Sequence, residues 1–357
     1  MRSFARRAVI GTMPGRGPYP GEGGLEAPTG KDFDMKATFI ACFDCEGKWG
    51  LADCLSDRDR VLLTDERLRG VYQRLIDLLD RWEIRGTFAF VSAFTLSVEE
   101  FITRQEWFED VVVDRKNWFL DFKKDVAGGR FQGWLTPAAF EIVRKASAHE
   151  IASHGFSHLP LSEGLISERT FLREMELVGK VAKLKDYEVK TLVYPRNLVG
   201  YLSALRFFGV IGYRGSLYSS MGKITGARVL LSDLNVFQKA QIPEKPNAGL
   251  VRIPPGFFLN PSVGLWRSIP VGIVLRRWFH AIDDALIQNG VIQLNTHPEN
   301  FIEGGERQFH LFEQILKYVS ERQKERAMNN LTHSEYCEQM LSDSMVAAFA
   351  ESPMPPL

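Results

Sequence analysis

Short apolar runs typical of buried strands alternate with amphipathic segments typical of helices along most of this chain. The strand-like runs cover residues 36–43, 86–91, 190–194, 210–213 and 290–296, and a further short run contains Ile151. The helix-like segments cover residues 65–82, 137–148, 168–184 and 202–208. Strands that alternate with helices form a parallel sheet whose crossovers are helical. We therefore expect an α/β fold built on a parallel sheet.

Polar residues with chemically useful side chains follow four of these strand-like runs. The groups are 44–46 (Asp-Cys-Glu), 154–158 (His-Gly-Phe-Ser-His), 195–197 (Pro-Arg-Asn) and 297–298 (His-Pro). The carboxyl ends of the strands of an α/β barrel meet at one face, which is where such folds place their chemistry. We therefore expect these four groups to converge on one site.

His154 and His158 are the strongest single indication of a metal site. Two imidazoles four residues apart can point at the same place, from one helical turn or from a tight loop. An isolated pair with this spacing also occurs by chance, with one histidine capping a loop and the other packing. The carboxylates of Asp44 and Glu46 at a neighbouring strand end favour the metal interpretation.

Composition indicates one enzyme-sized domain and excludes several kinds of partner. The chain has 357 residues, of which 45% are hydrophobic, and its 44 basic residues balance 44 acidic ones. A neutral balance gives no electrostatic reason to expect binding to nucleic acid or to an anionic membrane. We expect a loose Gly/Pro-rich arm at residues 1–35, a barrel at residues 36–345 and a tail at residues 346–357.

Neither a secretory signal nor a membrane span is predicted. The arginines near the N-terminus are not followed by an apolar stretch of signal-peptide length, and no apolar run approaches about 18 residues. The default expectation is a cytoplasmic protein without membrane insertion.

Cys42 and Cys45 have C-x-x-C spacing but no second pair of this kind follows. We therefore expect Cys42 to lie in a buried strand and Cys45 to lie beside the site without binding a metal.

Residues 99–134 interrupt the alternation with a concentration of aromatic side chains, including Trp107, Trp118 and Trp134. One interpretation is a lid that stacks sugar rings, and the other is a satellite core or a subunit interface. The proline-rich region 233–268 is irregular and is a candidate for the other wall of a cleft.

The order of these motifs resembles the polysaccharide deacetylase family, also known for its NodB homology domain. The resemblance rests on Asp44-Cys45-Glu46, Thr87-Phe88, His154-x-x-x-His158, Pro195-Arg196-Asn197 and Leu294-Asn295-Thr296-His297-Pro298, and it spans roughly residues 36–340. It implies a distorted (β/α) barrel of seven or eight strands that hydrolyses acetyl groups of sugars with a divalent metal. The family usually has two adjacent aspartates, whereas Cys45 follows Asp44 here, which places this chain with Asp-x-Glu members.

The resemblance also implies a role for each matching residue. Asp44 would be the general base, His297 the general acid, and Arg196 the residue that keeps Asp44 ionised and oriented. The expected metal ligands are Glu46, His154 and His158, with a site that lacks a protein carboxylate or a metal as the alternative. The expected substrate-binding residues are Trp49, Tyr194, Pro195, Asn197 and Leu294. Zinc is the expected metal, and cobalt, nickel and iron are alternatives.

The predicted function is removal of an acetyl group, on nitrogen rather than oxygen, from an amino sugar of a cell-surface polysaccharide or its precursor. Two other functions stay open. One is hydrolysis of a cyclic amide of the ureide type, which some relatives perform without a metal. The other is glycan binding without catalysis, against which the combined presence of a base, two histidine ligands and an acid argues.

Overall fold

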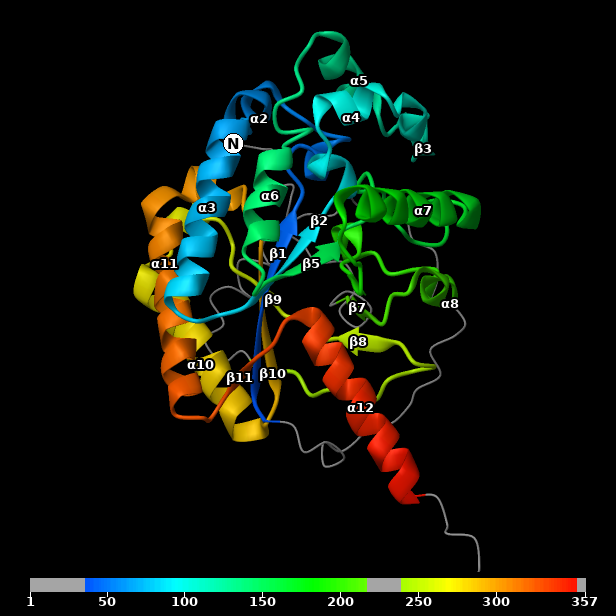
Figure 1. Cartoon of the computed structure of the whole chain (residues 1–357). Helices are drawn as coiled ribbons and strands as arrows, with labels where there is room; N and C mark the ends of the chain where they lie inside the picture. The colour runs from blue at the N-terminus through cyan, green and yellow to red at the C-terminus, as the bar shows by residue number, and fades with distance from the viewer. Residues whose placement is uncertain (1–35, 217–238, 352–357) are drawn as a thin grey trace, which may run out of the picture.

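The computed structural model describes residues 36–216 and 239–351, and it is built around one curled parallel sheet. Within these residues the sheet consists of β1 (Thr38–Cys45), β2 (Gly86–Phe90), β5 (Glu150–Ser153), β6 (Thr191–Leu192), β7 (Gly212–Arg214), β8 (Val251–Ile253), β9 (Phe257–Phe258), β10 (Val291–Thr296) and β11 (Asn329–Asn330). Their order is β8-β7-β6-β5-β2-β1-β10-β9, with β11 paired to β1 (Figure 1). The parallel sheet expected from the alternation of segments is confirmed, and its curl agrees with the distorted (β/α) barrel that the resemblance implied.

Strand β1 lies at the centre of this sheet and is buried along its whole length. Its residues 38–43 pair in parallel with β10, and its residues 41–45 pair in parallel with β2. The start of β1 pairs with β11 from near the other end of the chain. Because all these pairs are parallel, the strand ends that carry the predicted site residues lie at the same edge of the sheet.

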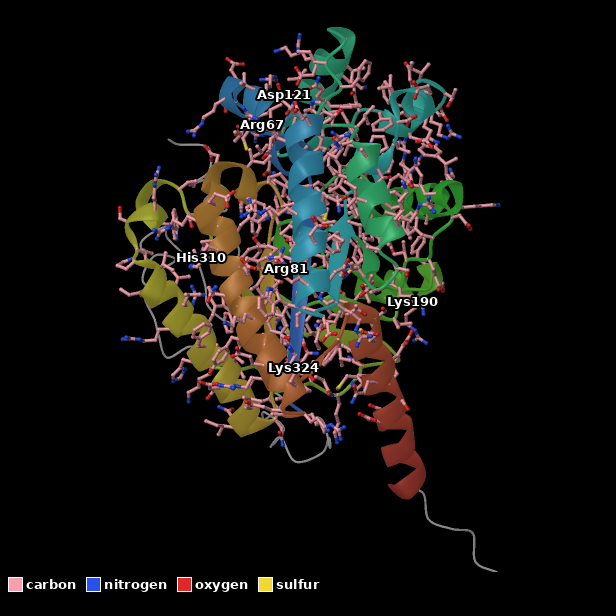
Figure 2. The ribbon with its side chains drawn as sticks, turned by 60° about the vertical axis from the view of Figure 1, so that its left-hand side comes forward. Arg67, Arg81, Asp121, Lys190, His310 and Lys324 are labelled. Atoms are coloured by element: carbon pink, nitrogen blue, oxygen red, sulfur yellow. The ribbon has the colours of Figure 1, made fainter. Side chains whose placement is uncertain are left out.

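Helices cover the outside of the sheet. They are α2 (Asp57–Leu62), α3 (Asp65–Arg81), α4 (Val98–Ile102), α5 (Leu120–Ala127), α6 (Pro137–Lys145), α7 (Glu168–Lys185), α8 (Leu202–Leu205), α10 (Val271–Gln288), α11 (Asn300–Lys324) and α12 (His333–Glu351). Helix α3 packs against α6 on one side and α11 on the other, and Arg81 and His310 mark α3 and α11 in Figure 2. Helix α3 forms where expected, because Thr64 caps its first turn and its apolar stripe is buried.

Most aromatic side chains of the insertion are buried and belong to the same hydrophobic core as the barrel, rather than to a lid or to a separate satellite core. The insertion contains α4, α5 and the short hairpin of β3 (Val112–Val113) and β4 (Lys116–Asn117), and it lies at the top of Figure 1. The side chains of Phe108, Trp118, Phe122 and Trp134 are each at most 2% exposed. A side chain this deeply buried offers no face for stacking a sugar, so these rings do not form a lid surface.

Several segments differ from the expectation. The region 233–268 was predicted to be irregular, but its described part contains the short strands β8 and β9. His333 is completely buried at the start of α12, where its backbone N–H donates to the Thr87 hydroxyl. The predicted arm at residues 1–35 lies outside the described residues, and α12 continues past residue 345 to Glu351.

Among the described helices, none is both long and apolar enough to span a membrane.

Candidate functional site

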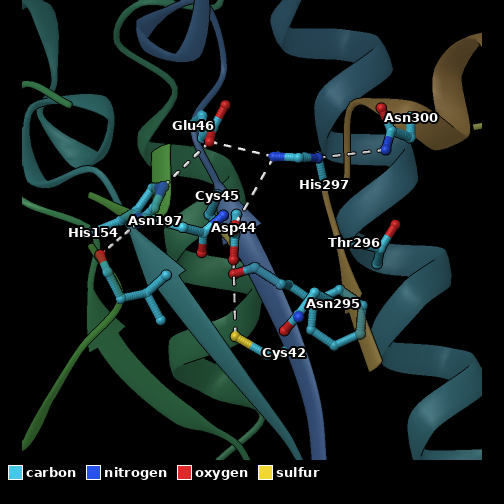
Figure 3. Close-up of polar contacts among 12 residues, drawn as sticks. Cys42, Asp44, Cys45, Glu46, His154, Asn197, Asn295, Thr296, His297 and Asn300 are labelled. Atoms are coloured by element: carbon cyan, nitrogen blue, oxygen red, sulfur yellow. Dashed lines mark hydrogen bonds and ion pairs between the residues drawn. The ribbon is translucent and has the colours of Figure 1, made fainter. Parts of the chain in front are cut away.

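Glu46, His154 and His158 converge on one point at the carboxyl edge of the sheet. The Glu46 Oε1 atom lies 3.2 Å from His154 Nε2 and 3.1 Å from His158 Nε2. Glu46 follows β1, and both histidines follow β5, so the parallel strand ends bring the three side chains together. Figure 3 shows Glu46 beside His154. All three residues are buried.

The donor atoms of this group fit a divalent cation. His154 Nδ1 lies 2.7 Å from the Val193 carbonyl oxygen, which can only accept, so Nδ1 carries the hydrogen and the Nε2 lone pair faces Glu46. An imidazole lone pair and a carboxylate facing each other repel unless a cation or a proton lies between them. In a tetrahedral site with bonds of about 2.0–2.1 Å, ligand atoms lie about 3.3 Å apart, close to the separations seen here.

The electrostatics of the group keep the carboxylate charged. Burial by itself would raise the pKa of Glu46, but the nearby imidazoles, first that of His158 and then that of His297, hold this pKa well below its usual range. Burial lowers the pKa of His158, which favours the neutral imidazole. An ionised carboxylate and neutral imidazoles are the protonation states that metal ligands require.

A tight loop, rather than a helix, brings the two histidines together. Gly155 and His158 both have positive φ, at 77° and 62°. The loop is held from below by Glu174 of α7, whose carboxylate accepts hydrogen bonds from the N–H groups of Phe156 and Ser157 and from the Ser157 hydroxyl. The buried Glu174 therefore replaces the intrahelical hydrogen bonds that this segment lacks.

Asp44 forms a two-pronged ion pair with Arg214, the last residue of β7. The two guanidinium nitrogens each lie 2.7 Å from a different Asp44 oxygen, and both residues are buried. Burial by itself would raise the pKa of Asp44, but the Arg214 charge and its hydrogen bonds lower it below its usual range. Because Arg214 engages both oxygens, Asp44 is less suited than Glu46 to bind a metal.

Arg196 does not have the predicted partner. Its guanidinium binds Asp53 at 2.6 Å and lies over the ring of Trp118, whereas Arg214 occupies the position beside Asp44. The backbone of Arg196 is left-handed, with φ of 58°, which turns its side chain out of the path that an extended strand end would give. The assignment of Arg196 as the residue that orients Asp44 is therefore wrong.

His297 lies between the two carboxylates at the end of β10. Its Nε2 atom is 3.4 Å from Glu46 Oε1 and 3.9 Å from Asp44 Oδ2 (Figure 3). The Phe258 ring of β9 stacks on the imidazole with an interplanar angle of 19°. His297 is the most exposed of the site histidines, with 15% of its side chain accessible to solvent.

Four of the five predicted substrate-binding residues are buried. Trp49 and Leu294 are completely inaccessible, and Trp49 belongs to the aromatic core of the insertion. Tyr194 is also inaccessible and donates its hydroxyl to the Gly200 carbonyl, and Pro195 is buried. Only Asn197 is partly exposed, and its side-chain oxygen accepts a hydrogen bond from Arg214. The apolar packing of Trp49 and Leu294 therefore contradicts their assignment to a substrate surface.

The sequence prediction missed Arg214 and the residues that hold it. Asn295 Oδ1 accepts from Arg214 at 3.2 Å and from Gln293 at 2.7 Å, and Gln293 in turn contacts His333. These side chains form a buried polar chain that ends at the Asp44–Arg214 pair. The available signal was that Arg214 ends a strand-like run, as Asp44 and His297 also do.

Several solved structures match most of the chain at low sequence identity. A protein from Mycobacterium smegmatis described as a polysaccharide deacetylase matches with a TM-score of 0.56 and 15% identity, over 93% of this chain and 98% of that one. PuuE allantoinase matches with a TM-score of 0.50 and 10% identity, over 89% of this chain and 95% of that one. No protein-family model and no curated protein matches the sequence. The chain has the distorted (β/α) barrel fold of the polysaccharide deacetylase type.

Proposed function

We propose that this protein is a metal-dependent hydrolase that removes an acetyl group from the nitrogen of an amino sugar. The observation that carries the proposal is the arrangement of Glu46, His154 and His158 beside an ionised Asp44 and an accessible His297. A metal site, a base and an acid within a few ångströms are what amide hydrolysis needs. A polysaccharide or its precursor is the proposed substrate, in keeping with the deacetylase described for the Mycobacterium smegmatis structure.

Glu46, His154 and His158 would hold the metal, with zinc as the proposed ion. Two imidazoles and one carboxylate suit zinc and leave room for substrate and water, while cobalt, nickel and iron accept the same donors. A bound ion would act as a Lewis acid that polarises the acetyl carbonyl and makes a water molecule more acidic. The ionised Asp44 would accept the proton of the water that attacks the carbonyl carbon, and Arg214 holds its carboxylate in place for this step.

His297 would complete the reaction by protonating the leaving nitrogen. Water oxygen forms the new bond to the carbonyl carbon, the C–N bond breaks, and the nitrogen takes a proton from imidazole Nε2 as the free amine leaves with acetate as the second product. Phe258 stacks on the ring and limits its rotation, so that Nε2 stays directed at the space between the two carboxylates. The site returns to its starting state when Asp44 releases the proton that it took from the water and the imidazole takes up one proton, both by exchange with solvent.

Acetate release tests this proposal directly. Purified protein stripped of metal and then given zinc should release acetate from oligomers of N-acetylated amino sugars, and a chelator should abolish the release. The same preparation is offered allantoin, because the allantoinase structure shares this fold. Opening of allantoin without acetate release would replace the proposal with a cyclic-amide hydrolase. Zinc-independent activity on either substrate would overturn the metal-dependent part.

The His297→Ala variant tests the general acid. An amine leaves poorly without a proton, whereas an alkoxide needs much less help, so the variant should lose far more kcat/KM on an N-acetyl sugar than on a matched O-acetyl sugar. Zinc content should stay unchanged. Equal losses on both substrates would show that His297 orients the substrate, and no loss on either would remove it from the mechanism.

A further inference from the structure

The Glu46 carboxylate fills the space that a side chain at position 50 would need. A Cβ atom built on Gly50 would lie 1.8 Å from Glu46 Oε2 and 2.8 Å from its carboxyl carbon, well inside van der Waals contact. Gly50 is in the short 3₁₀ helix Trp49–Leu51, and its φ lies outside the left-handed region, so its backbone conformation is open to any residue. The need for glycine at this position therefore comes from the neighbouring carboxylate.

The turn that carries both residues cannot move aside. Trp49 N–H donates to the Glu46 carbonyl at 3.0 Å, and Lys48 N–H donates to the Gly133 carbonyl at 2.8 Å. The indole of Trp49 is completely buried and donates to the Trp134 carbonyl at 2.8 Å. Hydrogen bonds to the aromatic insertion therefore hold the backbone of the turn that follows β1. We expect a methyl group added at position 50 to displace the Glu46 carboxylate rather than this backbone.

Displacing one oxygen of this carboxylate necessarily displaces the other. The methyl group would meet Oε2, whereas Oε1 faces His154 and His158. Both oxygens belong to one planar group, so any rotation that frees Oε2 also moves Oε1 away from the histidine nitrogens. A side chain shorter by one carbon would relieve the closest of these contacts, which are with Oε2 and the carboxyl carbon, and would leave the milder contact of 3.2 Å with the Glu46 Cβ atom.

We propose that Gly50 is a positioning residue for the metal centre and that its lack of a side chain is what allows a glutamate to serve as the carboxylate ligand in this chain. The inference rests on the proposed metal site. It predicts that residues 46 and 50 are coupled: enlarging residue 50 weakens metal binding much more when residue 46 is glutamate than when it is aspartate. Residues that orient metal ligands typically contribute about 10- to 100-fold in affinity, which sets the size of the expected effect.

Zinc affinity of the full chain, measured by competition with a chromophoric chelator, tests the coupling. Gly50→Ala should weaken zinc binding at least about tenfold. In the Glu46→Asp background, the same substitution should change the affinity less than about threefold, which defines a double-mutant cycle. Gly70→Ala is the matched control, because Gly70 lies in a helix where a Cβ atom meets nothing within 4 Å. The zinc affinity of the Gly70→Ala variant should equal that of the wild type.

Each outcome has a separate meaning. Absence of zinc binding by the wild type would overturn the proposed metal centre itself. Zinc binding by the wild type and by Gly50→Ala with equal affinity would overturn the role of Gly50. Equal losses in the two backgrounds would show that Gly50 acts on folding and not through Glu46. If Gly50→Ala fails to fold, recovery of folding and zinc binding in the double variant supports the coupling, and failure of the double variant overturns it.

Discussion

At the scale of single residues, the buried ion pair of Asp44 and Arg214 affects both the proposed catalysis and the stability of the fold. Arg214 keeps the proposed base ionised, and Asp44 supplies the only carboxylate that contacts this guanidinium among the described residues. Neither charge can reach water without a change in structure, because both side chains are at most 3% exposed. Removing one charge therefore leaves the other buried without compensation.

The Asp44→Asn variant should lose both activity and stability while it keeps zinc. Loss of a positioned base lowers kcat by roughly 10² to 10⁴. The uncompensated Arg214 should lower the free energy of unfolding by about 3–5 kcal/mol, so kinetics must be measured well below the unfolding midpoint. Chelator competition and urea unfolding provide the two further measurements. A fall in zinc affinity as large as the fall in kcat would make Asp44 a ligand instead of the base.

His333 should make the metal-free protein sensitive to mild acid. Burial, aided by the nearby Arg214 charge, lowers the pKa of this histidine from 6.5 to about 3. The unfolded chain then takes up the proton first, so the stability contributed by the neutral imidazole is present above pH 6.5 and lost as the pH falls toward 3. Between pH 7 and pH 5.5, protonation of this group in the unfolded chain should lower the free energy of unfolding by about 1 kcal/mol.

Urea unfolding of the metal-free wild type and of His333→Gln at these two pH values checks the prediction. The amide is neutral throughout, so the variant should lose less stability on acidification than the wild type does. Parallel losses in the two proteins would mean that other groups account for the acid sensitivity.

At the scale of elements, the aromatic insertion supports the site from outside the barrel. Trp118 donates its indole N–H to the Ser157 carbonyl in the histidine loop, and Trp49 of the carboxylate turn packs against Phe122 and Trp134. The insertion therefore contacts both segments that provide the proposed metal ligands. Its buried rings serve to hold these segments, which explains why a loop region carries so much apolar surface.

Phe122→Ala should destabilise the protein by about 3–5 kcal/mol, because it leaves a cavity in the part of the core that the insertion provides. Phe122 is 1% exposed and packs against Phe101, Phe108, Trp49 and Trp134. Phe207→Ala is the control, since Phe207 is 85% exposed, and it should change the free energy of unfolding by less than about 0.5 kcal/mol. Chemical denaturation measures both. An effect of Phe122→Ala as small as that of Phe207→Ala would show that the insertion contributes little to stability.

At the scale of the whole molecule, the proposed metal joins segments that are far apart in the chain. Glu46 follows the first described strand, whereas His154 and His158 follow β5, more than 100 residues later. An ion that binds the folded chain and not the unfolded one adds its binding free energy to stability. The metal centre is therefore expected to stabilise the barrel as well as to serve catalysis.

Zinc at about 100 times its dissociation constant should raise the free energy of unfolding by about 2.7 kcal/mol, and a chelator should reverse the gain. Thermal unfolding with and without zinc measures the shift. His158→Ala, which removes one proposed ligand, should show a much smaller shift. An equal shift in this variant would place the bound zinc elsewhere in the molecule.

The amino-acid sequence by itself determined the barrel and the residues at several of its strand ends. Alternating apolar runs and amphipathic segments report local periodicity, and parallel pairing follows from helices between strands. Asp44, Glu46, His154, His158 and His297 were found because each lies within a few residues of a recognisable strand end. The structure brings these five side chains together at one edge of the sheet.

Only the tertiary structure decided which arginine faces Asp44 and which aromatic side chains reach solvent. In the sheet order, β6, β5 and β2 separate β7 from β1, so Arg214 meets Asp44 only because the sheet curls. Arg196 was the nearer candidate in the motif, but its left-handed backbone turns it toward Asp53. Sheet curvature, single backbone angles and the burial of Trp49 depend on contacts between distant segments, which local sequence patterns do not encode.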